Sequence, residues 1–295
     1  MLTKIAWSSA NLKRRRENMN PRSSQSRLVS LAAGVVQEFS PEQVIYAAAN
    51  AGFNAVGVWC DLETWTSERT EKVKQALAET GITALDIEVV WFRPDEPLDK
   101  HNRVIDIAKT INAKNILCVS SEPDISDTKK RFKYFCEQVA GSDIRVVLEF
   151  LAITEINSLQ KAVEVVNDVS DPRGAILIDA LHLQRTGATI EDVANLISSE
   201  ATPGQLIPYV QICDATATLA DSTYAGILED AVHLRSIPGE GELPLEALLE
   251  IVGPGMPLSL EIRSRGLREQ YPELQDRADA VFTRTQNFLT ALNSL

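Results

Sequence analysis

Short apolar runs alternate with amphipathic segments along most of this chain. The runs rich in β-branched and other apolar residues are predicted strands, at residues 28–33, 55–59, 84–90, 115–119, 145–149, 175–179, 208–212 and 257–261. Most of them lack the polar alternation of a strand with one solvated face, which is typical of parallel strands covered on both sides. The pattern therefore predicts a buried parallel sheet.

The segments between these runs show helical periodicity. The first helix is expected to begin at Pro41, with Ser40 as its cap, Gln43 completing a capping box and Gly52 at its end. Further helices are predicted at 67–80, 101–112, 128–139, 157–167, 190–198 and 244–251, and within 273–292. Strand and helix alternate without a Pro/Gly/Ser-rich linker, which predicts one (β/α)8 TIM barrel, a single α/β domain over residues 28–295. The alternative is an open doubly wound sheet, but no GxGxxG follows the first strand.

Charge is distributed unevenly. Residues 1–27 hold seven Lys or Arg and one acid, although the whole chain has a net charge of -12. We expect 1–27 to be a basic, disordered extension; a nucleic-acid arm and a secretory signal running into 28–36 are the alternatives. The acidic body argues against nucleic-acid and membrane partners, and no apolar run approaches the roughly 20 residues of a membrane span.

The four cysteines are widely spaced, with no CxxC pair, which predicts reduced thiols and a cytoplasmic protein.

Polar residues end the last four predicted strands. These are Glu149, Asp179, Gln211 and Glu261, called the strand-end set below. In a parallel barrel the carboxyl ends of the strands meet at one mouth, where converging carboxylates repel one another unless a cation lies between them. Their oxygen ligands favour Mn²⁺ or Mg²⁺, with Co²⁺ acceptable and Zn²⁺ less suited. The alternative is that each side chain caps a helix or forms an ion pair, which would be ordinary for Asp179 alone.

The strand-end set, in this order, resembles the metal ligands of the xylose-isomerase-like sugar phosphate isomerase/epimerase superfamily. The resemblance covers about residues 28 to 292. It implies one divalent metal ion on the strand-end set, a substrate contact from His182 in D-x-x-H, and a catalytic role for Glu155, six residues after the first ligand. It also implies that Arg235, before the P-G-x-G turn, binds a substrate oxygen. Most sugar epimerases of the superfamily have histidine where Gln211 stands, whereas 3-dehydroshikimate dehydratases resemble this chain there.

The expected reaction is isomerisation or epimerisation of a sugar-like hydroxyketone, a keto-sugar or cyclitol, through an enediolate. Glu149 and Glu261 would move the proton on opposite sides of the substrate, while His182 and Arg235 offset developing charge. Further pocket-lining candidates, at the ends of the second and third strands, are Trp59, Trp91 and Glu88.

Two alternatives to the isomerase stay open. One is a dehydratase, with His182 or Glu155 as the acid; the other is a sugar-binding barrel without turnover. The superfamily's endonucleases for abasic DNA are excluded, because their zinc cluster needs many histidines and this chain has three.

We expect the segment between Gln211 and Arg235 to be a long loop that covers the mouth and shapes specificity. A homodimer or homotetramer is expected from the resemblance.

Overall fold

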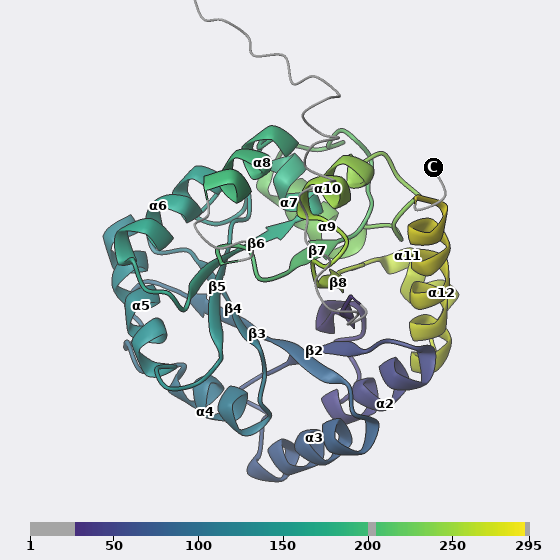
Figure 1. The fold of residues 1–295 in the computed structure, drawn as a ribbon, viewed down its shortest axis with the longest axis horizontal. Helices are drawn as coiled ribbons and strands as arrows, with labels where there is room; N and C mark the ends of the chain where they lie inside the picture. The colour runs from purple at the N-terminus through teal and green to yellow at the C-terminus, as the bar shows by residue number, and fades with distance from the viewer. Residues whose placement is uncertain (1–26, 200–204, 293–295) are drawn as a thin grey trace, which may run out of the picture.

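The computed structural model describes residues 27–199 and 205–292, which form a closed parallel barrel (Figure 1). The last strand pairs with the first, through Ser259 and Ser30 among others, so the sheet has no free edge. The strands are β1 Val29–Leu31, β2 Ala55–Trp59, β3 Thr83–Phe92, β4 Asn115–Ser120, β5 Arg145–Glu149, β6 Gly174–Asp179, β7 Val210–Ile212 and β8 Leu258–Leu260. The TIM barrel predicted from the sequence is confirmed.

Helices surround the barrel as an outer ring (Figure 1). Those at the predicted places are α2 Pro41–Ala51, α3 Ser67–Thr80, α4 Asn102–Thr110, α5 Ile125–Gln138, α6 Leu159–Val169, α8 Ile190–Ser199, α10 Leu245–Val252 and α12 Leu274–Leu292. As predicted, α2 ends at Gly52, whose φ of 105° is left-handed.

Four short helices were not predicted. They are η1 Ala33–Val35, α7 Ala180–Arg185, α9 Tyr224–His233 and α11 Arg265–Gln270. The expectation of a loop throughout the segment between Gln211 and Arg235 is therefore wrong for its second half, where α9 begins after Thr223. The Thr223 side chain accepts a hydrogen bond from the Gly226 N–H and caps this helix. The other three, η1, α7 and α11, have only three to six residues, which is too few turns for periodicity to separate them from loops.

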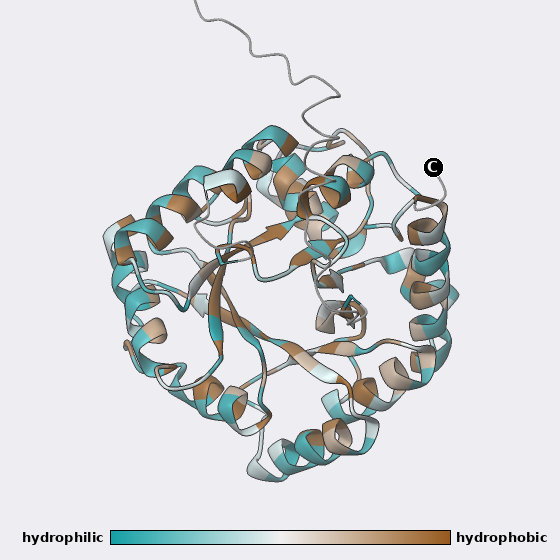
Figure 2. Ribbon diagram, in the orientation of Figure 1, coloured by the Kyte–Doolittle hydropathy of each residue, from teal (hydrophilic) through white to brown (hydrophobic). Residues whose placement is uncertain are grey.

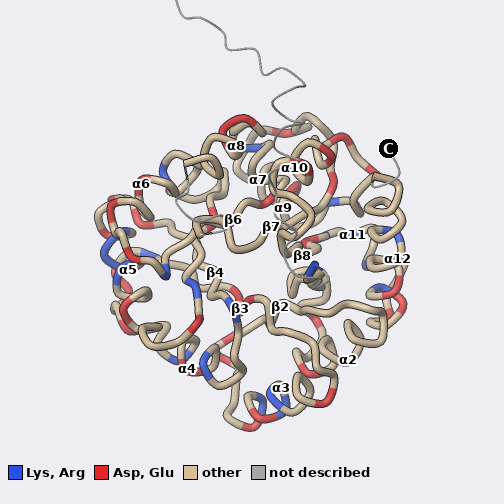
Figure 3. The backbone as a smooth tube through the Cα atoms, viewed as in Figure 1, with Lys and Arg blue, Asp and Glu red and all other residues tan. Residues whose placement is uncertain are grey.

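The apolar core lies mainly between the barrel and its helices. Strand residues such as Leu31, Val58 and Ile178 face outward into this layer, while Leu117, Val147 and Leu177 fill the barrel interior. Figure 2 shows apolar strands inside a ring of helices whose outer faces are polar, and Figure 3 shows charged residues on that ring. Among the described residues, no helix is long and apolar enough to span a membrane.

The barrel carries buried polar side chains on β1, β3 and β8. Ser30, Asp86 and Ser259 are fully buried, and among the described residues none of their side-chain oxygens has a partner at hydrogen-bonding distance and angle; the Tyr209 hydroxyl lies near enough to Asp86 to influence its pKa. Gly57 leaves the space that Asp86 occupies, because a Cβ atom at position 57 would lie 2.7 Å from Asp86 Oδ1. TIM-barrel interiors are normally filled with branched apolar side chains, so these buried polar side chains are unusual.

The predicted basic extension lies outside the described residues, except for Arg27. The Arg27 side chain donates hydrogen bonds to the carbonyl oxygens of Gly253 and Pro254, at 2.7 and 2.8 Å, in the turn before β8. Its carbonyl oxygen accepts from Asn54 Nδ2. Arg27 is thus held against the amino-terminal end of the barrel.

Candidate active site

The strand-end set gathers at the carboxyl-terminal mouth of the barrel. Glu149 ends β5, Asp179 ends β6, Gln211 lies in β7, and Glu261 directly follows β8. All of them are buried, with no more than 6% of each residue exposed. Asp179 and Gln211 are direct register partners, so their side chains point the same way from neighbouring strands. The four side chains thus lie at one mouth, and their role as metal ligands stays a prediction.

Asp179 has two structural partners. Its Oδ1 atom accepts the backbone N–H groups of Leu181 and His182, at 2.8 and 3.0 Å, which makes Asp179 the N-cap of α7. Its Oδ2 atom accepts a hydrogen bond from Arg235 Nη1 at 2.7 Å. Burial alone would raise the pKa of Asp179, but the charge of Arg235 and these hydrogen bonds hold it below its ordinary value. Asp179 is therefore ionised, as a metal ligand must be.

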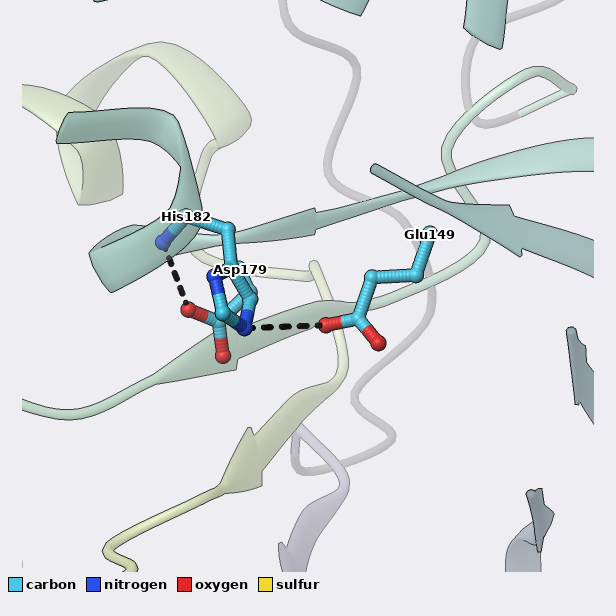
Figure 4. A group of neighbouring side chains, drawn as sticks. All are labelled: Glu149, Asp179 and His182. Atoms are coloured by element: carbon cyan, nitrogen blue, oxygen red, sulfur yellow. Dashed lines mark hydrogen bonds and ion pairs between the residues drawn. The ribbon is translucent and has the colours of Figure 1, made fainter. Parts of the chain in front are cut away.

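His182 joins Glu149 and Asp179 in one tight group. Each offers a ligand atom, and these atoms all lie within 4.8 Å of one another (Figure 4). His182 Nε2 lies 3.9 Å from Glu149 Oε1. Burial lowers the pKa of His182 to about 4, against the opposing effect of Asp179, so the imidazole is neutral near pH 7. A neutral imidazole is a metal ligand or a hydrogen-bonding group, so His182 can serve the metal as well as the substrate.

Glu261 lies outside this group of three. Its Oε2 atom is buried and has no hydrogen-bond partner among the described residues. Burial raises the pKa of Glu261 and raises that of Glu149 well above its ordinary value, and the charge of Asp179 adds to both shifts. Arg235 and Arg263 oppose these shifts. The mouth thus holds more negative charge than its arginines compensate, which is the electrostatic conflict that the sequence indicated.

Arg235 is fully engaged with the protein. Its Nε atom donates to the Ala231 carbonyl oxygen at 2.8 Å, and Nη1 also donates to the Glu261 carbonyl oxygen at 3.2 Å. Its Nη2 atom lies 3.2 Å from His182 Nε2. Because a guanidinium can only donate, His182 accepts at Nε2 and carries its proton at Nδ1. In this arrangement Arg235 orients Asp179 and His182, and the predicted contact with a substrate oxygen stays a prediction.

The other predicted site residues differ in their position relative to this centre. Glu88, on β3, is buried, and its Oε1 atom accepts the Ala33 N–H at 3.1 Å. Trp59 ends β2, and Trp91 donates from Nε1 to Ser121 Oγ at 2.9 Å. Both tryptophans are partly exposed, as pocket walls would be.

Glu155 does not join the group. Its side chain is exposed, in the segment between β5 and α6, where its backbone N–H donates to the Ser120 carbonyl oxygen. The strand-end pattern did not single out Arg263, which lies two residues beyond Glu261 in the run LEIRS. Its basic character directly after a strand-end acid was the available signal.

Comparison with known families identifies this architecture. A profile described as the xylose isomerase-like TIM barrel matches residues 45–286, which is most of the chain. The chain belongs to this family.

Solved structures share the fold of this family member at low identity. A xylose isomerase-like TIM barrel/4-hydroxyphenylpyruvate dioxygenase fusion protein has a TM-score of 0.73 and 21% identity over 91% of this chain, which spans 45% of that protein. An IolI protein with a bound zinc atom has a TM-score of 0.67 and 18% identity, covering 90% of this chain and 97% of that one. A D-allulose 3-epimerase from Methylomonas sp. has a TM-score of 0.61 and 13% identity, covering 90% and 99%. Curated proteins yield no match.

The donor set of this xylose isomerase-like barrel fits a divalent cation. Glu149 and Asp179 supply carboxylate oxygens and His182 supplies a neutral nitrogen, while Glu261 has a buried oxygen without a partner in the described part of the chain. Nε2 of His182 has a single lone pair, which here faces Arg235, so a metal ion on Nε2 would displace that contact. An imidazole ligand suits Zn²⁺ as well as Mn²⁺, and the preference for Mn²⁺ or Mg²⁺ stays a prediction.

Metal binding should be measurable without any substrate. We expect Mn²⁺ to raise the melting temperature, since a ligand at 100 times its Kd stabilises a native protein by about 2.7 kcal/mol. Glu149→Gln should abolish this shift, whereas Glu71→Gln, on the exposed face of α3, should retain it. Equal Mn²⁺ affinity of both variants by isothermal titration calorimetry would contradict the assignment of Glu149 as a ligand.

Proposed function

We propose that this barrel is a metal-dependent isomerase or epimerase that abstracts a proton beside the carbonyl of a sugar-like hydroxyketone. The observation that carries the proposal is the buried rim itself. Glu149 and Glu261 lie at the ends of β5 and β8 with raised pKa values, and His182 and Asp179 lie between them in chain order. A site of this kind provides two carboxylates for proton transfer and a centre for a cation.

The two glutamates have complementary roles. A carboxylate whose pKa is raised by burial is a stronger base than one in water, so Glu149 can accept a proton from carbon. Glu261 comes from a strand separated from β5 by β6 and β7, and its free Oε2 atom can return a proton on the other side of the substrate. A divalent ion, when bound, would polarise the carbonyl oxygen and thereby acidify the neighbouring C–H bond.

His182 assists the reaction as a neutral group, and Arg235 assists as a cation paired with Asp179. His182 is neutral and carries its proton at Nδ1 because Nε2 accepts from Arg235, so Nδ1–H would be the group that donates to a substrate oxygen. Arg235 keeps Asp179 and His182 in place through Nη1 and Nη2. Water is restricted at these side chains because all three are buried.

A dehydratase is the second candidate. It would use the same proton abstraction and then expel a β-hydroxyl group, with His182 or Glu155 as the acid. Gln211 favours a dehydratase, since it stands where most sugar epimerases of the superfamily have histidine. The D-allulose 3-epimerase and D-psicose 3-epimerase among the structural neighbours favour the epimerase, at 13% and 14% identity. Glu155 is exposed, which weakens the dehydratase mechanism that needs it as the acid.

Incubation of the Mn²⁺-loaded protein with a panel of hydroxyketones in D₂O separates the candidates. Deuterium gained at carbon without loss of water is the expected result and supports an isomerase or epimerase. Loss of water, or a new conjugated chromophore, would replace that proposal with the dehydratase. Binding of a hydroxyketone without exchange or dehydration across the panel would instead indicate a non-catalytic sugar-binding barrel.

A further inference from the structure

A second arginine, Arg263, lies at the rim of the site. It follows Glu261 by two residues, and its side chain runs beside Gly34. A Cβ atom added at Gly34 would be 2.3 Å from Glu261 Oε1 and 3.0 Å from Arg263 Cδ, so both side chains pack against this glycine. Its positive charge lowers the pKa values of Glu88, Glu149 and Glu261, partly offsetting the effect of burial on all three. Arg263 therefore lies close to the proposed reaction centre.

The guanidinium of Arg263 is incompletely bonded. Its Nη2 atom donates to Gln37 Oε1 at 3.1 Å, but its Nε–H is buried and has no acceptor among the described residues. Within the same part of the chain, no carboxylate oxygen comes within the 4.0 Å of an ion pair with it. Arg235 differs, because its Nε, Nη1 and Nη2 atoms all meet protein acceptors.

This difference points to a ligand. A buried donor without a partner destabilises the folded protein, and a guanidinium that serves only to balance charge would avoid that cost by pairing with a nearby acid. Arg263 is only partly buried, and its hydrogen bond to Gln37 is solvent-exposed. An anionic group arriving from solvent would complete the hydrogen bonds that the protein leaves open.

We propose that Arg263 binds a carboxylate of the substrate, which makes the substrate a keto-acid sugar rather than a neutral ketose. This inference rests on the proposed function, since it names the substrate class of the same site. The Nε–H and the neighbouring amine of a guanidinium form a planar fork that matches the two oxygens of a carboxylate.

A phosphate group fits this rim less well. Phosphate sites commonly combine several backbone N–H groups at a glycine-rich turn or helix N-terminus, and the chain has no glycine-rich cradle of that kind. Glu88, Glu149 and Glu261 surround the mouth, and a dianionic phosphate would be repelled about twice as strongly as a carboxylate. A single partly satisfied arginine suits a single negative charge.

Three probes that differ in one end group test the proposal. The compounds are 5-keto-D-gluconate, L-sorbose and L-sorbose 6-phosphate, which carry a carboxylate, a hydroxymethyl group and a phosphate at the same carbon. Dissociation constants are measured by calorimetry on the Mn²⁺-loaded wild-type protein and on Arg263→Gln. The matched control is Arg265→Gln, because Arg265 is exposed and pairs with Glu229 at 2.8 Å outside the site.

We expect the wild-type protein to prefer 5-keto-D-gluconate to L-sorbose by about 10- to 100-fold, as for a charge-assisted hydrogen-bonded pair. Arg263→Gln should remove this preference and leave the affinity for L-sorbose within about twofold, while Arg265→Gln keeps the preference. Retained Mn²⁺ binding and an unchanged melting temperature in Arg263→Gln would show that the site is intact.

Several results would overturn the proposal. They are an unchanged carboxylate preference in Arg263→Gln, tighter binding of L-sorbose 6-phosphate, or no binding of 5-keto-D-gluconate to the wild-type protein. Because these are binding measurements, they are independent of turnover. A carboxylate preference that depends on Arg263, without any deuterium exchange, would support this inference while contradicting the proposed catalysis.

Discussion

Glu149→Gln is expected to slow deuterium exchange into a hydroxyketone substrate by about 100- to 10,000-fold, the contribution typical of a general base. Glutamine preserves the shape of the side chain but cannot accept a proton from carbon. It also removes one negative charge from the group formed with Asp179 and His182, so metal affinity should fall in the same variant. The measurement is single-turnover exchange in D₂O, followed by mass spectrometry at saturating Mn²⁺.

Two further variants separate the role of base from that of ligand. Glu261→Gln should also suppress exchange, since the proton must be returned from the β8 side, while Glu71→Gln on α3 should exchange at the wild-type rate. If Glu149→Gln binds Mn²⁺ normally and exchanges normally, Glu149 is neither base nor ligand. Normal exchange in both glutamate variants would remove the proposed mechanism altogether.

The sequence pattern predicts the barrel and the place of the strand-end set, but it does not predict which side chains contact one another there. Strands buried on both faces give continuous apolar runs, so a polar residue at the end of such a run, as at Glu149 or Asp179, stands out in the sequence. The sequence does not indicate that Arg235 is the partner of Asp179. Arg235 lies 56 residues away, and the bond between them depends on how β6 and the segment after α9 pack.

His182 illustrates the same limit at short range. Its position, three residues after Asp179, indicated a functional role, but the direction of its ring depends on α7, a helix too short to be recognised from periodicity. Because α7 begins at Ala180, directly after Asp179, the imidazole turns back toward the ends of β5 and β6 and joins Glu149 (Figure 4). The sequence predicted a substrate contact from His182; the structure adds that it can also be a metal ligand.

The strand pattern did not indicate that Asp86 points into the barrel interior. The run ALDIEVV was interpreted as a buried strand, and the register of β2 with β3 shifts between Val56 and Gly57, which brings Asp86 opposite Gly57. Strict alternation does not reveal which face such a residue takes after a register shift. The result is a buried carboxyl in the barrel interior, with no ion pair among the described residues.

Asp86→Asn is therefore expected to stabilise the protein, and to do so more at higher pH. Burial raises the pKa of Asp86 from its ordinary value of 3.8 to about 7; the charge of Glu261 adds to the rise, and the hydroxyl of Tyr209 opposes it. Between these two values the folded protein keeps a proton that the unfolded chain has lost, so stability falls as pH rises toward 7. One pKa unit corresponds to about 1.4 kcal/mol, so the loss amounts to about 4 kcal/mol above pH 7.

Asparagine has nearly the same shape and no proton to lose, so this loss should disappear. The free energy of unfolding in urea, measured with EDTA to keep the rim metal-free, should exceed that of the wild-type protein by about 4 kcal/mol at pH 8. Near pH 4 the two proteins should differ little. Asp106→Asn, on the exposed face of α4, should match the wild-type protein at both pH values. A gain in Asp86→Asn that is equal at pH 4 and pH 8 would mean that packing, and not the ionisation of Asp86 inside the barrel, accounts for the change.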